Sequence, residues 1–179
     1  MRKITELRER LIRLNYAQFI GVQVVLGLIA LAIQFAIILL WGISIPTDRF
    51  ENGYTFIGLQ ARLIPSALIE TLLFQYLPFI IFSRWVKNSA SRKILKPTRY
   101  ILFSSVVFGL FHIIGTHWLM PLVVIRVLFT ALCGMVLAVS FYILRRKKQM
   151  PILSVTLIHF LINFILISVG TVLDLIMTI

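Results

Sequence analysis

Five long apolar segments restrict this chain to a membrane fold. They cover residues 16–43, 63–82, 100–118, 120–144 and 151–173. An α-helix rises about 1.5 Å per residue, so about 20 apolar residues cross a hydrocarbon core about 30 Å thick. Composition agrees, because 13% of the 179 residues are charged, against about a quarter in soluble domains. The sequence therefore predicts an all-α, polytopic membrane bundle of about five transmembrane helices.

The chain is expected to form a single domain. We find no internal repeat, low-complexity tract or linker, so one transmembrane domain is predicted over residues 16–179. Before it, apolar residues recur at helical spacing beside Arg8, Arg10 and Arg13. This pattern is typical of an amphipathic helix on a membrane surface, and it predicts such a segment over residues 1–15 on the cytoplasmic side.

The distribution of basic residues predicts the topology. Lys and Arg number 18 against 6 Asp and Glu, a formal charge of +12. Fifteen of the 18 lie before the first apolar segment, between the second and third, or between the fourth and fifth. Cytoplasmic loops are enriched in Lys and Arg, so we expect a multi-pass protein of the cell membrane with its N-terminus inside and its C-terminus outside. Nucleic acid is not an expected partner, because a nucleic-acid module carries its basic residues on a soluble face.

Ionisable and polar side chains inside the apolar segments are the candidates for function, since a charge at the bilayer centre costs at least about 2.5 to 3.5 kcal/mol. Glu70 is the only carboxylate well inside a segment. Of the three histidines, His112 and His159 lie well inside segments while His117 is at the external end of the third, and Asn163 follows His159 by one helical turn. Counted from the nearest basic flank at about 1.5 Å per residue, all four lie about 17 to 22 Å deep. Four residues at one depth can form one site.

These residue types suit the hydrolysis of a peptide bond. Glu70 can take a proton from water as a general base, with His112 holding the water or sharing the proton. His159 and Asn163 can donate hydrogen bonds to the oxyanion that forms when a carbonyl is attacked. Two histidines and a glutamate also match a catalytic zinc site. A divalent metal such as zinc thus stays open, with Glu70, His112 and His159 as candidate ligands, although the HExxH pattern is missing.

Two other interpretations remain open from the residues alone. Histidine and asparagine in membrane helices can simply hydrogen-bond to neighbouring helices. Glu70 can also act as a proton relay in a small proton-coupled transporter.

Three motifs resemble those of the CPBP intramembrane proteases, also called the CAAX prenyl protease or Abi family, which includes bacteriocin-processing and immunity proteins. Glu70 begins a segment similar to the EExxxR motif of that family. Phe108 and His112 match the FxxxH motif, and His159 and Asn163 match the HxxxN motif. The motifs occur in the family's order on three separate predicted helices.

The resemblance covers roughly residues 65–163 and implies a protease-like core over about residues 63–173. It implies a glutamate-dependent intramembrane endopeptidase in which Glu70 activates water, and a membrane-bound or lipidated peptide as substrate. The second glutamate of the first motif is Thr71 here, and its arginine is Gln75. A non-catalytic bacteriocin-immunity or regulatory protein on the same scaffold is therefore the main alternative.

Overall fold

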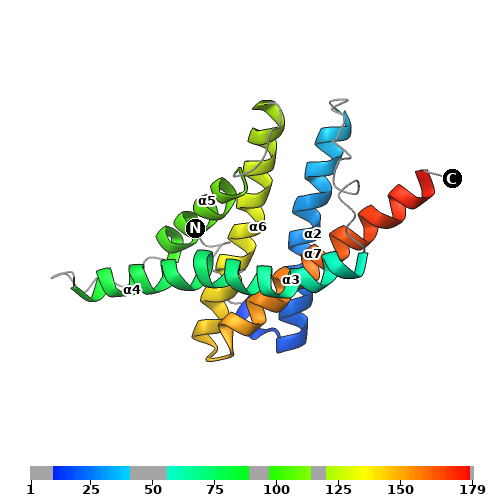
Figure 1. The fold of residues 1–179 in the computed structure, drawn as a ribbon. Coiled ribbons are helices and arrows are strands. Elements are labelled where there is room, and N and C mark those ends of the chain that lie inside the picture. The colour runs from blue at the N-terminus through cyan, green and yellow to red at the C-terminus, as the bar shows by residue number, and fades with distance from the viewer. Residues whose placement is uncertain (1–9, 41–55, 89–96, 114–119, 178–179) are drawn as a thin grey trace.

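The computed structural model describes residues 10–40, 56–88, 97–113 and 120–177, and their regular secondary structure is entirely helical (Figure 1). The predicted all-α fold is confirmed. The elements in chain order are α2 (Tyr16–Leu40), α3 (Phe56–Thr71), the π-helical turn η1 (Leu72–Tyr76), α4 (Leu77–Asn88), α5 (Pro97–Phe111), α6 (Met120–Arg146) and α7 (Pro151–Met177).

Within the part of the chain that the structure describes, four helical stretches are long and apolar enough to cross a membrane. They are Tyr16–Ile37, Ala61–Arg84, Val123–Arg146 and Pro151–Val169. α5 is a shorter apolar helix of 15 residues, about 22 Å long at the usual rise. The chain is thus a multi-pass helical membrane protein, as predicted.

The third expected span, residues 100–118, differs from the helix found there. α5 begins earlier, at Pro97, and ends at Phe111, while residues 114–119 lie outside the described part. Proline is favoured in the first turn of a helix because no N–H is needed there. At the other end, the amides of His112 and Ile113 bond to carbonyls three residues back, Gly109 and Leu110, which is the tightened last turn of a helix.

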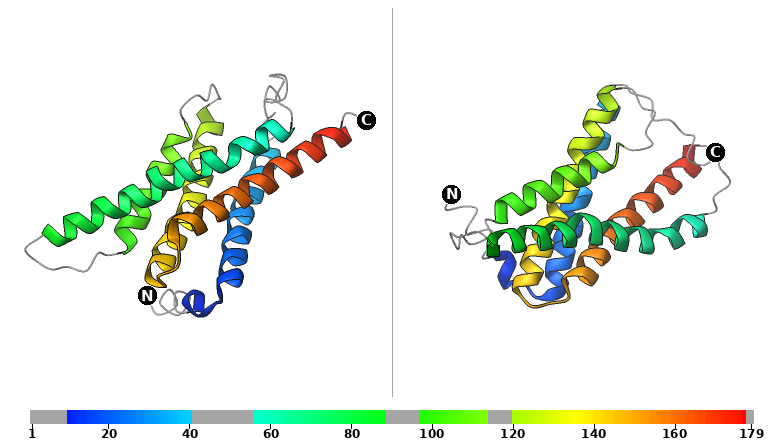
Figure 2. Two further views of the ribbon diagram at one scale, coloured as in Figure 1. Left: turned by 60° about the horizontal axis from the view of Figure 1, so that its bottom comes forward. Right: turned by 60° about the vertical axis from the view of Figure 1, so that its left-hand side comes forward.

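The starts of the helices that follow the three basic segments lie at the same end of the bundle. Tyr16 at the start of α2 hydrogen-bonds to Ser154 at the start of α7, with 2.8 Å between the hydroxyl oxygens. The rings of Tyr100, early in α5, and Phe141, late in α6, lie 6.4 Å apart. The starts of α2, α5 and α7 and the end of α6 therefore meet at one end of the molecule (Figure 2). This arrangement is the one that the distribution of Lys and Arg requires.

The predicted amphipathic segment is only partly within the described residues. Residues 1–9 lie outside them, and residues 10–13 are helical. Leu11, Ile12 and Leu14 pack against the hydrophobic core. Lys147 fixes this segment to the α6–α7 turn by donating a hydrogen bond of 2.7 Å from Nζ to the Leu14 carbonyl.

α5 and α6 pack closely because small residues lie between them. A Cβ built on Gly109 would lie 2.7 Å from the Val127 carbonyl oxygen and 2.8 Å from Cβ of Ala131. One built on Gly134 would lie 2.9 Å from the Phe108 ring. Small residues permit this kind of close backbone approach between membrane helices. The contact fixes the end of α5, just before His112, against α6.

The helix that carries Glu70 changes its winding just after that residue. α3 continues into η1, where the amide of Leu77 bonds to the carbonyl of Leu72 five residues earlier. Pro78 accounts for this wide turn, because proline has no N–H to donate and its ring clashes with the carbonyl four residues before it. That carbonyl belongs to Phe74.

α5 supplies the donors that this turn needs. Ser104 Oγ hydrogen-bonds to the Phe74 carbonyl and also contacts Gln75 Oε1 at 2.6 Å. Tyr100 OH donates to the Gln75 carbonyl at 3.2 Å. All four residues are buried. These bonds hold the turn next to Glu70 against α5.

Candidate active site

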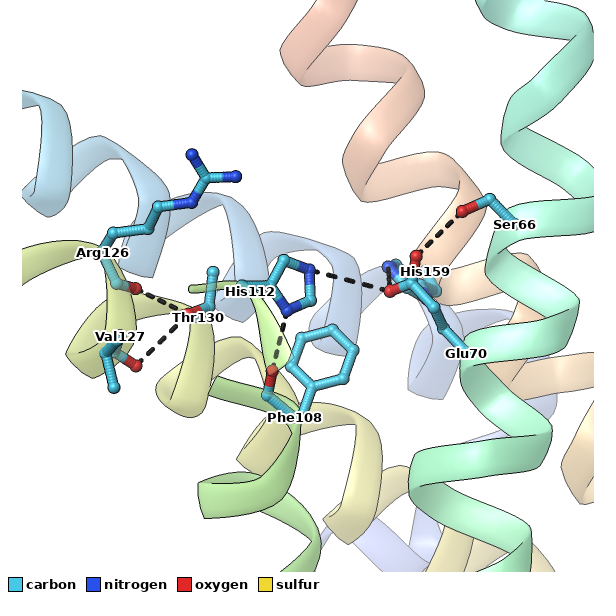
Figure 3. Close-up of polar contacts among 8 residues, drawn as sticks. All are labelled: Ser66, Glu70, Phe108, His112, Arg126, Val127, Thr130 and His159. Atoms are coloured by element: carbon cyan, nitrogen blue, oxygen red, sulfur yellow. Dashed lines mark hydrogen bonds and ion pairs between the residues drawn. The ribbon is translucent and has the colours of Figure 1, made fainter. Parts of the chain in front are cut away.

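Glu70, His112 and His159 come together from three helical segments (Figure 3). Oε2 of Glu70 lies 3.6 Å from Nε2 of His159 and 3.8 Å from Nε2 of His112. Both separations exceed a direct hydrogen bond, but they place two imidazoles around one carboxylate oxygen. The Glu70 side chain is 18% exposed, but Oε2 itself is buried and has no hydrogen-bond partner among the described residues.

The second carboxylate oxygen of Glu70 has its own partner. Ser66, one turn earlier on α3, donates a hydrogen bond of 2.8 Å from Oγ to Oε1. Residues four apart lie on the same face of a helix, so this bond comes from α3 itself. It fixes the carboxylate with Oε1 toward Ser66 and Oε2 toward the histidines.

His112 lies in the turn just past the end of α5, not within a helix as expected. Its Nδ1 is 2.7 Å from the carbonyl oxygen of Phe108. A carbonyl oxygen only accepts, so Nδ1 carries the hydrogen, and Nε2 of the neutral ring is an acceptor. The Phe108 carbonyl in the last turn of α5 thus sets the tautomer of His112. It also directs Nε2 of the ring toward Glu70. Arg126 and Thr130 of α6 border the site on the His112 side (Figure 3).

His159 is the most deeply buried of the three, with 6% of its side chain exposed. The ring of Phe108 packs against both imidazoles, with centroids 4.6 Å from His112 and 5.6 Å from His159. The phenylalanine of the FxxxH pattern therefore forms an apolar wall between the two histidines. This packing restricts the rotation of both imidazole rings.

Asn163 lies one turn beyond His159 on α7 and is half-buried. The common depth predicted for it and the other three residues stays a prediction. It makes no hydrogen bond to Glu70, His112 or His159, so the structure brings three of the four candidates into direct proximity.

Thr71 and Gln75 occupy the two altered positions of the first motif. Thr71 is 1% exposed and Gln75 is completely buried. Gln75 is bonded through Oε1 to Ser104 of α5, and no hydrogen bond links it to Glu70. In place of a charged partner at these positions, Glu70 has Ser66.

A metal site is not formed by the described residues. Glu70, His112 and His159 are close together, yet among residues 10–40, 56–88, 97–113 and 120–177 no group of three His, Cys, Asp or Glu side chains is arranged to hold a metal ion. The two histidines face the carboxylate oxygen itself. We therefore derive no step through a metal.

Two features of the site were missed by the sequence reasoning. Ser66 could have been found by its spacing of one turn from Glu70. The contacts of Ser104 with the π-helical turn depend on how α5 packs. In the local sequence, only Pro78 indicates that such a turn forms.

A family model for type II CAAX prenyl endopeptidases, described as Rce1-like, matches residues 52–165. That is more than half of the chain, and it includes the segments that carry Glu70, His112, His159 and Asn163. The chain belongs to the Rce1-like family. The resemblance to CAAX-type intramembrane proteases inferred from the three motifs is confirmed. No significant match was found among curated proteins or among solved structures.

Proposed function

We propose that this Rce1-like protein is an intramembrane endopeptidase that hydrolyses a peptide bond of a membrane-associated or lipidated peptide, with Glu70 as the general base. The observation that carries the proposal is the approach of two imidazole Nε2 atoms to Oε2 of Glu70, at 3.6 and 3.8 Å. Isolated polar residues that only bridge helices have no reason to converge on one carboxylate oxygen.

In the first step, Glu70 activates the attacking water molecule. A water molecule hydrogen-bonded to Oε2 loses a proton to the carboxylate as its oxygen attacks the peptide carbonyl carbon. Nε2 of His112, an acceptor in the neutral ring, can hold the second hydrogen of that water and so orient it. Ser66 keeps the carboxylate from rotating by its bond to Oε1.

The second step concerns the charge that develops on the substrate. Attack converts the carbonyl oxygen into an oxyanion, which preorganised donors stabilise in a site of limited water access. His159 and Asn163, one turn apart on α7, are the proposed donors. When the C–N bond breaks, the proton held by Glu70 passes to the departing amine, and Glu70 is again ionised.

A substrate screen tests this function. Purified protein in liposomes would be incubated with prenylated CAAX peptides and with unprenylated transmembrane peptides, and products would be identified by mass spectrometry. We expect cleavage of at least one class by the wild type and loss of it in Glu70→Gln. Cleavage that Glu70→Gln retains in full would overturn the role of Glu70.

A non-catalytic immunity or regulatory role is the second candidate. It is favoured by the neutral residues Thr71 and Gln75, which stand where the resemblance places two charged groups. In that case no peptide is cleaved, and Glu70→Gln and His159→Ala still protect cells or bind the partner peptide as the wild type does.

A further inference from the structure

An open groove lies at the basic end of the bundle, apart from the candidate active site. Its volume is about 380 Å³, and it is bounded by the α3–η1 helix and by the corner where α6 meets α7. Leu68, Met150, Ile152 and Leu153 form much of its wall. Leu153 is 62% exposed, so the groove faces the surroundings of the bundle. In a membrane-spanning chain these surroundings are lipid.

One cation lies on this apolar wall. Arg145, in the last turn of α6, lines the groove together with Tyr76. Its guanidinium carbon is 5.8 Å from the centroid of the Phe79 ring, a cation–π distance. Both ion pairs found among the described residues involve Glu70 and a histidine, so Arg145 has no carboxylate partner there. The packed guanidinium keeps its fork of N–H donors available for an anion.

The neighbouring charges have the same sign. Arg146 and Lys148 are exposed beside Arg145. Lys147 differs, because it bonds to the Leu14 carbonyl and lies 5.6 Å from the Phe19 ring. Arg145 therefore places a positive charge on a groove whose wall is otherwise mostly apolar, and this combination is complementary to an anionic amphiphile.

We propose that this groove binds one anionic phospholipid, with its phosphate on Arg145 and an acyl chain along Leu68 and Leu153. Arginine binds phosphate oxygens through two parallel hydrogen bonds, whereas the apolar wall offers nothing to a free, hydrated anion. Basic residues next to membrane helices attract anionic lipid of the cytoplasmic leaflet. The predicted topology puts this end of the bundle in that leaflet.

The test measures lipid retained by the full chain. Protein would be purified from bilayers of equal phosphatidylglycerol and phosphatidylcholine, and bound lipid would be counted by native mass spectrometry. Arg145→Gln removes the proposed phosphate contact. Arg99→Gln is the matched control, because Arg99 is an exposed arginine at the start of α5, at the same end of the bundle but outside the groove. Leu153→Trp fills the groove without changing the charge.

We expect the wild type to retain phosphatidylglycerol in preference to phosphatidylcholine. Arg145→Gln should lower this retention at least about tenfold, the loss expected for charge-assisted hydrogen bonds to a phosphate, and Leu153→Trp should lower it as well. Arg99→Gln should leave it unchanged. Equal losses in Arg145→Gln and Arg99→Gln would overturn the proposal, since only general charge attraction would remain. It would also be overturned if Leu153→Trp kept the lipid, or changed the oligomeric state in place of lipid binding, which would make the groove a contact between copies.

Discussion

Oε2 of Glu70 on α3 lies 3.6 Å from Nε2 of His159 on α7. These helices pack directly on one another, and the His159 imidazole is also held by the Phe108 ring of α5. A histidine that is buried, oriented and next to a carboxylate inside the bundle is suited to stabilise charge in a transition state.

His159→Ala should therefore lower kcat/KM for peptide cleavage by at least about 100-fold, the usual scale for losing one oxyanion donor. Asn163→Ala should have a smaller effect, because Asn163 does not contact the carboxylate. The rates would be measured in liposomes at saturating and limiting substrate. A His159→Ala rate within twofold of the wild type would contradict this role.

Ser66→Ala should reduce cleavage roughly threefold to tenfold, since a hydrogen bond of about 1 kcal/mol to the carboxylate is lost. Ser66→Thr keeps a hydroxyl at the same position and should retain most of the activity. The same rate of cleavage in Ser66→Ala and the wild type would show that the bond to Oε1 does not position Glu70.

Gly109→Ala should destabilise the protein by about 1 to 3 kcal/mol, because the new methyl group would collide with backbone and Cβ atoms of α6. A matched control is Gly21→Ala, where a Cβ would meet nothing within 4 Å and the change should be neutral or slightly stabilising. Thermal unfolding in detergent distinguishes the two. Equal melting temperatures for both variants would argue against tight α5–α6 packing.

Ser104→Ala should cost about 1 to 3 kcal/mol of stability, since the Phe74 carbonyl and the Gln75 amide would lose their buried donor. Ser105→Ala is the control. Ser105 Oγ bonds to the carbonyl of Ile101 within its own helix, at 2.6 Å, and that carbonyl can keep its backbone partner. If both variants have the same unfolding temperature, the claim that α5 stabilises the π-helical turn is wrong.

The overall fold was largely predictable, because long apolar runs and clusters of Lys and Arg depend only on the local sequence. The end of α5 was not, and His112 lies beyond that end. The helical rise predicts a shared depth for Glu70, His112, His159 and Asn163. Depth says nothing about the rotation of each helix, which is set by packing, and so the different position of Asn163 could not be predicted.

The interactions around Glu70 were harder to predict for the same reason. Ser66 follows from helical spacing once Glu70 is chosen. The π-helical turn arises from Pro78, but its stability depends on Ser104 and Tyr100, which are about 25 residues or more away in the sequence. Only the folded arrangement of α5 brings those hydroxyl groups to the turn.

Replacing Glu70 with glutamine provides the sharpest test, because Glu70→Gln preserves the size of the side chain and removes the base. The measurement is kcat/KM for the best cleaved peptide in liposomes, with Asp174→Asn as a control for losing an acidic residue elsewhere in the same domain. We predict a loss of at least about 100-fold for Glu70→Gln and a rate close to the wild type for Asp174→Asn. Wild-type cleavage by a correctly folded Glu70→Gln protein would contradict the assignment of Glu70 as the general base.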